Sequence, residues 1–170
     1  AAAGFNDSSW DSVSLPGTLL PYIKKKGGPI QGFLWIRKTI HVDGIMPRGD
    51  LGLILGRIGH ADVTYFNGTR IGATGKSTPE QFSMWNHPRH YMVPQSIIRF
   101  GGTNVIAVRI WYYSFCEVQG DLALAALAEW ARSRTVSTIL FVALNYIIIA
   151  LGVPIFFIFF FIYLRRRSSQ

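Results

Sequence analysis

The chain is poor in two kinds of residue: it has one cysteine in 170 residues and only nine aspartates and glutamates. The single cysteine, Cys116, excludes an internal disulfide, and with it the class of small domains that disulfides hold together. Because 17 lysines and arginines face those nine acids, the formal net charge is +8. A positive surplus of this kind favours contact with anionic lipid headgroups or with an acidic partner.

Charged residues are absent from 136–164, and this segment is the clearest signal in the chain. As a helix rising about 1.5 Å per residue it would reach about 43 Å, more than the roughly 30 Å of hydrocarbon in a bilayer. A secretory signal would be N-terminal and shorter. The segment is therefore predicted to be a transmembrane helix, the alternative being a buried helix of a soluble domain. Asn145, Gly152 and Pro154 interrupt it and are candidate contacts with neighbouring helices, or tolerated irregularities facing lipid.

Three consecutive arginines, Arg165, Arg166 and Arg167, follow the span directly. Positive residues beside a span favour the cytoplasmic side, so residues 165–170 are predicted to be a basic cytoplasmic tail. Arg132 and Arg134 on the other side reduce the contrast. Residues 1–135 would then lie outside the cytoplasm, a topology that disfavours nucleic acid as a partner.

The region before the span reads as strands. Residues 33–42, 51–55, 61–66 and 104–113 are rich in β-branched and aromatic residues and are separated by glycine, proline and asparagine turn signals. We predict an all-β sandwich or jelly roll over residues 1–120. Asn67-Gly68 is predicted to form a type I′ hairpin turn. With Thr69 it is also a glycosylation sequon, an alternative that the turn makes unnecessary.

After Gly120 the composition changes to strong helix formers. Asp121 is predicted to cap a helix with its body at 122–132, which runs directly into the membrane. Residues 121–135 would thus form a helical juxtamembrane linker, followed by the transmembrane helix 136–164. Trp130 is expected at the outer headgroup level, where an indole ring is favoured.

The sequence lacks catalytic motifs. Residues 72–77 resemble the end of a phosphate-binding loop, but Arg70 stands where that motif needs glycine. No nucleophile elbow is present, and paired carboxylates would have to come from acids scattered among strands. His87 and His90 supply only two potential metal ligands. We therefore expect no enzyme activity, no cofactor and no metal.

Two groups of residues are candidates for binding. The first is a ligand rim that comprises Trp85, Asn86, His87, Arg89 and Tyr91. Its aromatic rings would stack on a sugar face while its polar groups form hydrogen bonds with the sugar. The alternative is that these are ordinary loop residues. The second is an aromatic surface at the end of the last long strand, comprising Trp111, Tyr113 and Phe115, for contact with a protein, a ligand or headgroups. Arg37 and Arg109 lie among strand positions and need partners, for which Asp7, Asp11 and Asp62 are candidates.

The order of several motifs is specific enough to carry a resemblance. They lie at residues 7–17, 32–38, 53–56 with 62–72, 89–94 and 102–109. Over residues 5–115 the chain resembles the sugar-binding jelly-roll domain of glycoside hydrolase family 2, within the galactose-binding-like superfamily. In those hydrolases the catalytic carboxylates belong to a separate barrel, for which this chain has no length. It is also similar to the extracytoplasmic sensors of bacterial membrane receptors, in which an Ala/Leu/Arg-rich helix leads into the first membrane helix.

Two functions follow as expectations. In the first, the chain is a non-catalytic accessory subunit in a bacterial inner membrane, with a periplasmic sandwich and one span bound to a larger integral complex, such as a respiratory or photosynthetic assembly. This view rests on a chain that keeps scaffold and anchor without a catalytic or signalling part. In the second, it is the carbohydrate- or ligand-binding sensor ectodomain of a membrane receptor. Both expect contact with the lipid bilayer.

Overall fold

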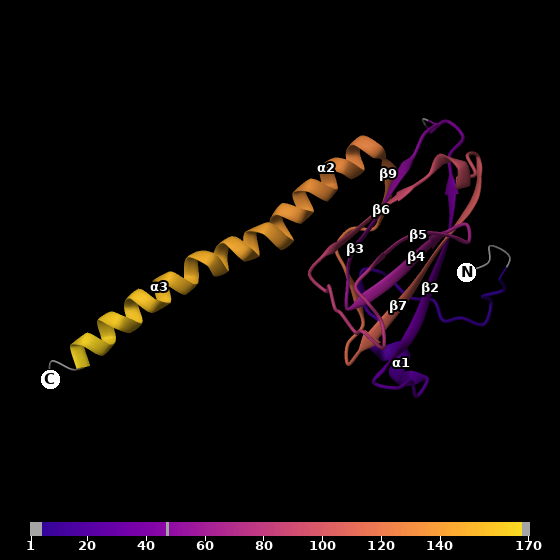
Figure 1. Ribbon diagram of the computed structural model, residues 1–170. Coiled ribbons are helices and arrows are strands. Elements are labelled where there is room, and N and C mark those ends of the chain that lie inside the picture. The colour runs from indigo at the N-terminus through magenta and orange to yellow at the C-terminus, as the bar shows by residue number, and fades with distance from the viewer. Residues whose placement is uncertain (1–4, 47, 168–170) are drawn as a thin grey trace.

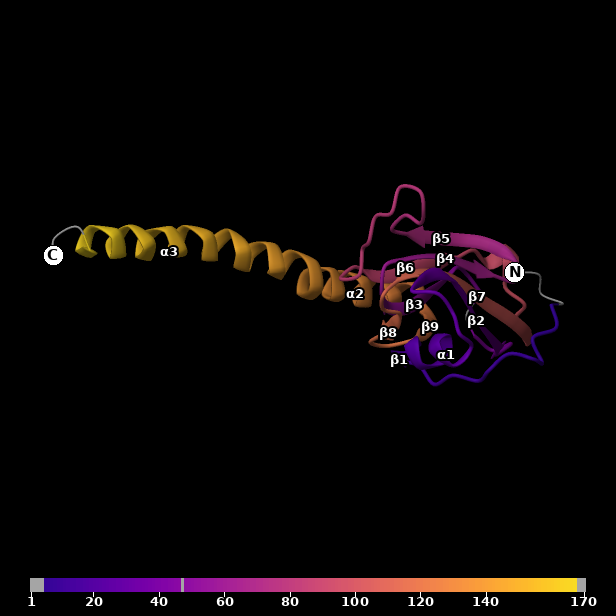
Figure 2. The same cartoon turned by 90° about the horizontal axis from the view of Figure 1, so that it is seen from below.

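The computed structural model describes residues 5–46 and 48–167. It consists of a two-layered β-sandwich and one long helix that projects away from it (Figure 1). The two layers are seen edge-on in Figure 2, with α3 far from both. The predicted all-β domain with a C-terminal apolar helix is confirmed.

One layer is a four-stranded sheet with the order β2–β7–β4–β5. Its strands are β2 (Gln31–Val42), β7 (Gly102–Tyr113), β4 (Ala61–Phe66) and β5 (Thr69–Thr74). The long pair β2 and β7 runs antiparallel from Gln31 opposite Tyr113 to Val42 opposite Gly102. The segment 104–113, rich in Val, Ile and aromatic residues, therefore lies in the central strand β7, whereas 33–42 lies in the edge strand β2.

The other layer has the order β1–β8–β3–β6, with β9 also paired to β3. Its strands are β1 (Gly17–Thr18), β8 (Glu117–Gln119), β3 (Leu51–Ile58), β6 (Pro88–Val93) and β9 (Ala123–Ala126). A short helix α1 (Leu20–Lys25) and a 3-10 turn η1 (Gln95–Ile97) lie in the connections. The core between the layers is apolar, with Leu53, Phe66, Val93 and Ile110 almost completely buried.

The predicted hairpin turn joins β4 to β5. Asn67 and Gly68 both have positive φ, 48° and 88°, as a type I′ turn requires. The Asn67 side chain is used inside the fold, since its amide donates to the carbonyl of Ile97 at 2.7 Å and its oxygen accepts from the backbone N–H of Val105 at 2.8 Å. These bonds account for the asparagine as a turn residue.

The predicted helix start is wrong. Residues 123–126 form β9, which pairs antiparallel with β3 from Leu51 opposite Ala126 to Ile54 opposite Ala123, and the helix begins only at Leu127. Residues 123–126 form a strand despite their helix propensity, because backbone groups on this edge of β3 need hydrogen-bond partners. The boundary at residue 120 is corrected accordingly, since the sheet continues to Ala126.

Helix α2 (Leu127–Thr138) is docked on the sandwich. Trp130 lies over Gly52 of β3 and is only 9% exposed; a Cβ added at Gly52 would lie 1.9 Å from the Trp130 ring. His90 Nε2 of β6 lies 3.4 Å from the Ser133 hydroxyl. Trp130 is therefore buried against the sandwich, and its place at the headgroup level stays a prediction.

The helix continues without a break to Arg167. A π-helical turn η2 (Ile139–Ala143) joins α2 to α3 (Leu144–Arg167), and the Arg57 guanidinium of β3 lies 4.3 Å from the Phe141 ring there. Within Leu127–Arg167 the most apolar 18-residue stretch has a mean hydropathy of 2.8, and none of that stretch is buried in the molecule. By length and composition this helix could cross a membrane.

We expect Gly52→Ala to detach α2 from the sandwich, because even a methyl group overlaps Trp130. Loss of the tryptophan contact removes roughly 2 kcal/mol of apolar burial, which corresponds to a tenfold or larger rise in the detached population. Limited trypsinolysis in detergent would measure this as faster cleavage after Arg132 and Arg134. Gly49→Ala is the matched control, since a Cβ there meets nothing within 4 Å. Equal cleavage rates in the two variants would contradict the docking.

Candidate functional site

Arg89, predicted to lie on an exposed ligand rim, is 0% exposed. Its Nε donates to a carboxylate oxygen of Asp62 at 2.8 Å, and one guanidinium nitrogen donates to the carbonyl of His60 at 2.9 Å. The other donates to the carbonyls of Met84 and His87. The guanidinium thus holds the 84–87 loop to the sandwich, so its assignment to the rim is corrected to an internal structural role.

Tyr91 is buried in the same cluster. Its hydroxyl donates to Asp62 at 2.8 Å and lies 2.8 Å from the Thr74 hydroxyl, while Thr64 donates to the same Asp62 carboxylate at 3.0 Å. Burial raises the pKa of Tyr91 far above its usual value, so the phenol stays protonated and remains a donor. Tyr91 therefore does not form part of a surface rim either.

The rest of the predicted rim stays at the surface. Trp85 is 58% exposed, Asn86 and His87 are half-buried, and His87 Nδ1 lies 3.1 Å from the carbonyl of Pro88. The structure thus separates the five residues into an exposed loop and a buried cluster. Strand alternation along β6 carries the signal that distinguishes them, because residues 89, 91 and 93 face inward together.

The predicted aromatic surface is also divided. Trp111 is 5% exposed, which corrects its assignment to the surface, while Tyr113 is half-exposed and Phe115 partly buried. His60 packs between them, with ring centroids 4.2 Å from Phe115 and 5.6 Å from Trp111. Burial lowers the pKa of His60, so the imidazole is held neutral.

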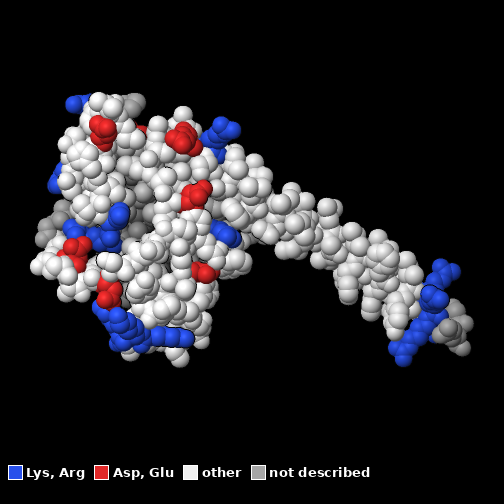
Figure 3. Space-filling model, turned by 180° about the vertical axis from the view of Figure 1, so that it is seen from behind, with Lys and Arg blue, Asp and Glu red and all other residues white. Residues whose placement is uncertain are grey.

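The residues predicted to contact partners in the membrane lie along α3. Gly152 and Pro154 are exposed, and the Asn145 amide donates within its own helix to the carbonyl of Phe141 at 2.8 Å. The arginines at 165–167 form the basic tip of the helix, which is visible in Figure 3. Contact with a neighbouring helix stays a prediction, and residues 168–170 of the predicted tail lie outside the described residues.

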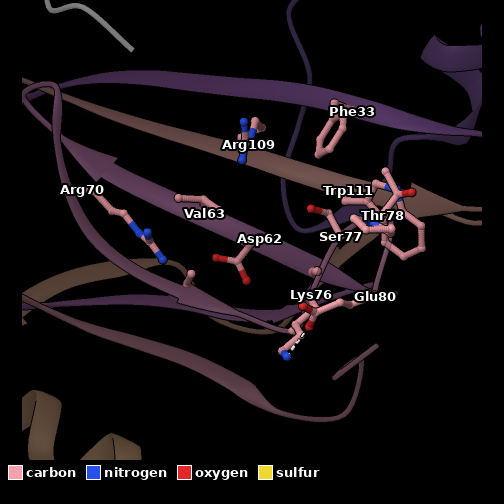
Figure 4. Close-up of a pocket in the computed structure, with 14 residues that line it drawn as sticks. Phe33, Asp62, Val63, Arg70, Lys76, Ser77, Thr78, Glu80, Arg109 and Trp111 are labelled. Atoms are coloured by element: carbon pink, nitrogen blue, oxygen red, sulfur yellow. Dashed lines mark hydrogen bonds and ion pairs between the residues drawn. The ribbon is translucent and has the colours of Figure 1, made fainter. Parts of the chain in front are cut away.

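A pocket that the sequence did not reveal lies on the outer face of the β2–β7–β4–β5 sheet (Figure 4). It has a volume of about 350 Å³. Its floor is made of the small residues Ala61, Val63 and Ala73, Phe33 and Trp111 lie along one side, and the loop of residues 75–80 forms another. Small side chains in register on β4 and β5 leave the space that larger ones would fill.

Two arginines of this pocket have no carboxylate partner among the described residues. Arg109 lies between Trp35 and Val63 in strand register, and its guanidinium is 5.0 Å from the Phe33 ring. Its buried Nε has no hydrogen-bond partner. Arg70 lines the pocket from β5. Of the acids predicted to pair with Arg37 and Arg109, Asp7 bonds Arg37 at 2.6 Å as expected. The other two go elsewhere, since Asp11 lies 3.2 Å from Lys26 and Asp62 holds Arg89.

A second and larger hollow, of about 1140 Å³, lies between the two sheets where β2 faces β9. It is bordered by apolar side chains of both layers, among them Leu34, Ile36, Leu53 and Leu124. No group of three or more His, Cys, Asp or Glu able to hold a metal occurs in residues 5–46 and 48–167.

Comparison with known proteins shows the fold alone. No family model matches the sequence, and no curated protein matches it. Among solved structures, a glycosyl hydrolase family 2 member from Bacteroides cellulosilyticus has a TM-score of 0.56 at 16% identity, covering 73% of this chain and 18% of that chain. Beta-glucuronidase 2 from Bacteroides uniformis has a TM-score of 0.54 at 19% identity, with coverages of 74% and 15%. The chain thus corresponds to less than a fifth of either hydrolase.

We expect Asp62→Asn to destabilise the sandwich by roughly 3–5 kcal/mol, because it leaves the Arg89 charge buried without its counterion. For a domain of this size the melting temperature should fall by about 10 °C or more. Circular dichroism of the full chain in detergent would follow the β signal. The control is Glu80→Gln, which breaks the exposed pair with Lys76 and should cost at most about 1 kcal/mol. Equal melting temperatures would argue against the cluster.

Proposed function

We propose that the chain is the membrane-anchored, extracytoplasmic ligand-binding part of a bacterial membrane receptor, without catalytic activity of its own. The observation that carries this proposal is the direct passage from sandwich to helix. Ala126 ends β9 and Leu127 begins α2, so no linker separates the sheet from the helix. In a domain joined in this way, a shift of the sheet would be passed directly to the helix.

The packing of α2 against the sandwich makes the junction between β9 and α2 rigid. Hydrogen bonds hold β9 to β3, Trp130 fills the space above Gly52, and His90 faces Ser133. The helix is therefore fixed to β3 and β6, and a rotation or shift of these strands could be transmitted along it. The π-helical turn η2 lies where the helix leaves the sandwich, and such turns frequently occur at functional positions.

Charge supports the orientation in the membrane. The tip of α3 carries Arg165, Arg166 and Arg167, and cations directly after a span favour the cytoplasmic side. The sandwich would then lie in the periplasm.

A second candidate is the accessory subunit of an integral membrane complex, such as an energy-transducing assembly. The exposed surface of α3 favours it. Phe156 stacks on Phe160 with centroids 6.0 Å apart, which makes a flat aromatic ridge on the helix. A ridge beside Gly152 would suit packing against other membrane helices.

We expect the two ends of the span to be labelled from opposite sides of the membrane. In cells, a membrane-impermeant maleimide should react with Ser83→Cys on the sandwich without treatment, and with Ser169→Cys only after permeabilisation. The parent chain is the control, because burial raises the pKa of its Cys116 to about 12 and keeps that thiol unreactive. The reverse labelling pattern would contradict the proposed orientation.

Extraction in mild detergent followed by native-size separation should distinguish the two candidates. A receptor part is expected to migrate alone or as a homo-oligomer. Migration in a stoichiometric complex with other integral membrane proteins would instead support the accessory subunit. Mass spectrometry of the separated species identifies which proteins accompany the chain.

A further inference from the structure

We infer that the pocket on the outer face of the β2–β7–β4–β5 sheet binds an acidic sugar, with the anionic group held by Arg109 and Arg70. The inference rests on the proposed binding function and names the ligand class of its site. It starts from the two guanidinium groups, which meet no carboxylate among the described residues.

The position of Arg109 is the strongest part of the argument. The Nε atom is buried and makes no hydrogen bond, and a buried donor without an acceptor is costly. The residue sits in the middle of β7, with β2 on one side and β4 on the other, so its backbone is fixed. A ligand oxyanion in the pocket would bond the terminal nitrogens of this guanidinium, which unlike Nε are not buried without a partner, and would balance a charge that no described carboxylate balances.

Arg70 adds a second cation to the same hollow. Figure 4 shows both side chains at the pocket. Arg109 of β7 lies opposite Val63 of β4, and Arg70 of β5 lies opposite Tyr65, two residues farther along β4. The planar fork of a guanidinium matches the geometry of a carboxylate or sulfate. Lys76 is less available, because it is paired with Glu80.

The remaining walls suit a sugar ring. Phe33 is half-exposed, and its ring borders the hollow beside Arg109, where it can lie against the apolar face of a pyranose. Ser77 and Thr78 bring hydroxyl groups from the loop. Gly75 allows this loop to approach, since its φ is +74° and an added Cβ would lie 2.7 Å from the carbonyl of Phe82. The volume of about 350 Å³ is at the small end of ligand pockets and fits a small saccharide.

The nearby acids do not cancel this positive charge. The Asp62 carboxylate is fully buried, and its charge is balanced by Arg89. Glu80 is balanced by Lys76. An anion in the pocket would therefore face a net positive surface at Arg70 and Arg109.

Isothermal titration of the full chain in detergent with glucuronate and galacturonate tests the inference, with glucose, galactose and inorganic sulfate as comparison ligands. We expect at least one of the two uronates to bind, and its affinity to fall about tenfold or more in Arg109→Gln and in Arg70→Gln. Arg109→Lys should lose part of the affinity, because it keeps the charge without the fork. Arg99→Gln is the matched control: it removes one exposed arginine outside the pocket and should bind as the parent does.

Several results would overturn the inference. These are equal binding of neutral sugars, equal binding of sulfate alone, absence of uronate binding, or unchanged affinity in Arg109→Gln that melts at the parent temperature. None of them would alter the labelling pattern that tests the membrane topology. Conversely, a reversed topology would remove the proposed receptor role and leave binding in detergent measurable, so the two failures are distinguishable.

Discussion

The pairing of β9 with β3 relates the two halves of this molecule. Without it, the chain after Gly120 would be a tether, and the orientation of the sandwich relative to the long helix would be free. With it, Leu51–Ile54 of β3 is paired with β6 on one side and with β9 on the other, so the start of α2 is set by sheet hydrogen bonds. Gly52 then permits Trp130 to settle on the sheet.

Strand β4 gives the two faces of its sheet different roles. Asp62 and Thr64 face the interior, where the carboxylate collects Arg89, Tyr91 and a threonine hydroxyl. Ala61 and Val63 face outward and form the floor of the pocket. Because alternation has a period of two, the polar cluster and the pocket lie one residue apart along the chain while opening to opposite sides of the sheet.

The sequence predicted what depends on local pattern. Alternating apolar strands, the Asn67-Gly68 turn and the uncharged run before Arg165 all appear in the structure as expected. It failed where long-range contacts override local preference. The alanine-rich segment at 123–126 is a strand because β3 offers it a partner, and propensity contains no information about that edge.

The candidate site was harder to predict for a related reason. Arg89 and Trp85 are close in sequence and both suit ligand binding, but only burial separates the structural arginine from the exposed indole. The pocket is built from residues on four strands and a loop, and several of them, such as Ala61 and Ala73, have small side chains without functional groups. These residues matter because they leave space, and an alanine in a sequence does not indicate whether it borders a pocket.

These contacts also relate the pocket to the helix. Val63 on the pocket floor is adjacent in β4 to Asp62, and Asp62 binds Arg89 of β6. The residue after Arg89 is His90, which faces Ser133 of α2. Contact of this kind is a spatial connection and becomes coupling only if the elements have two arrangements that a ligand distinguishes. The cluster is well placed for this, because a buried ion pair resists gradual distortion and its members move together or separate at high cost. An anion held at Arg109 would act on β7 and β4 next to that cluster, and the ion pair of Asp62 with Arg89 joins the sheet that holds the pocket to strand β6, which contacts α2.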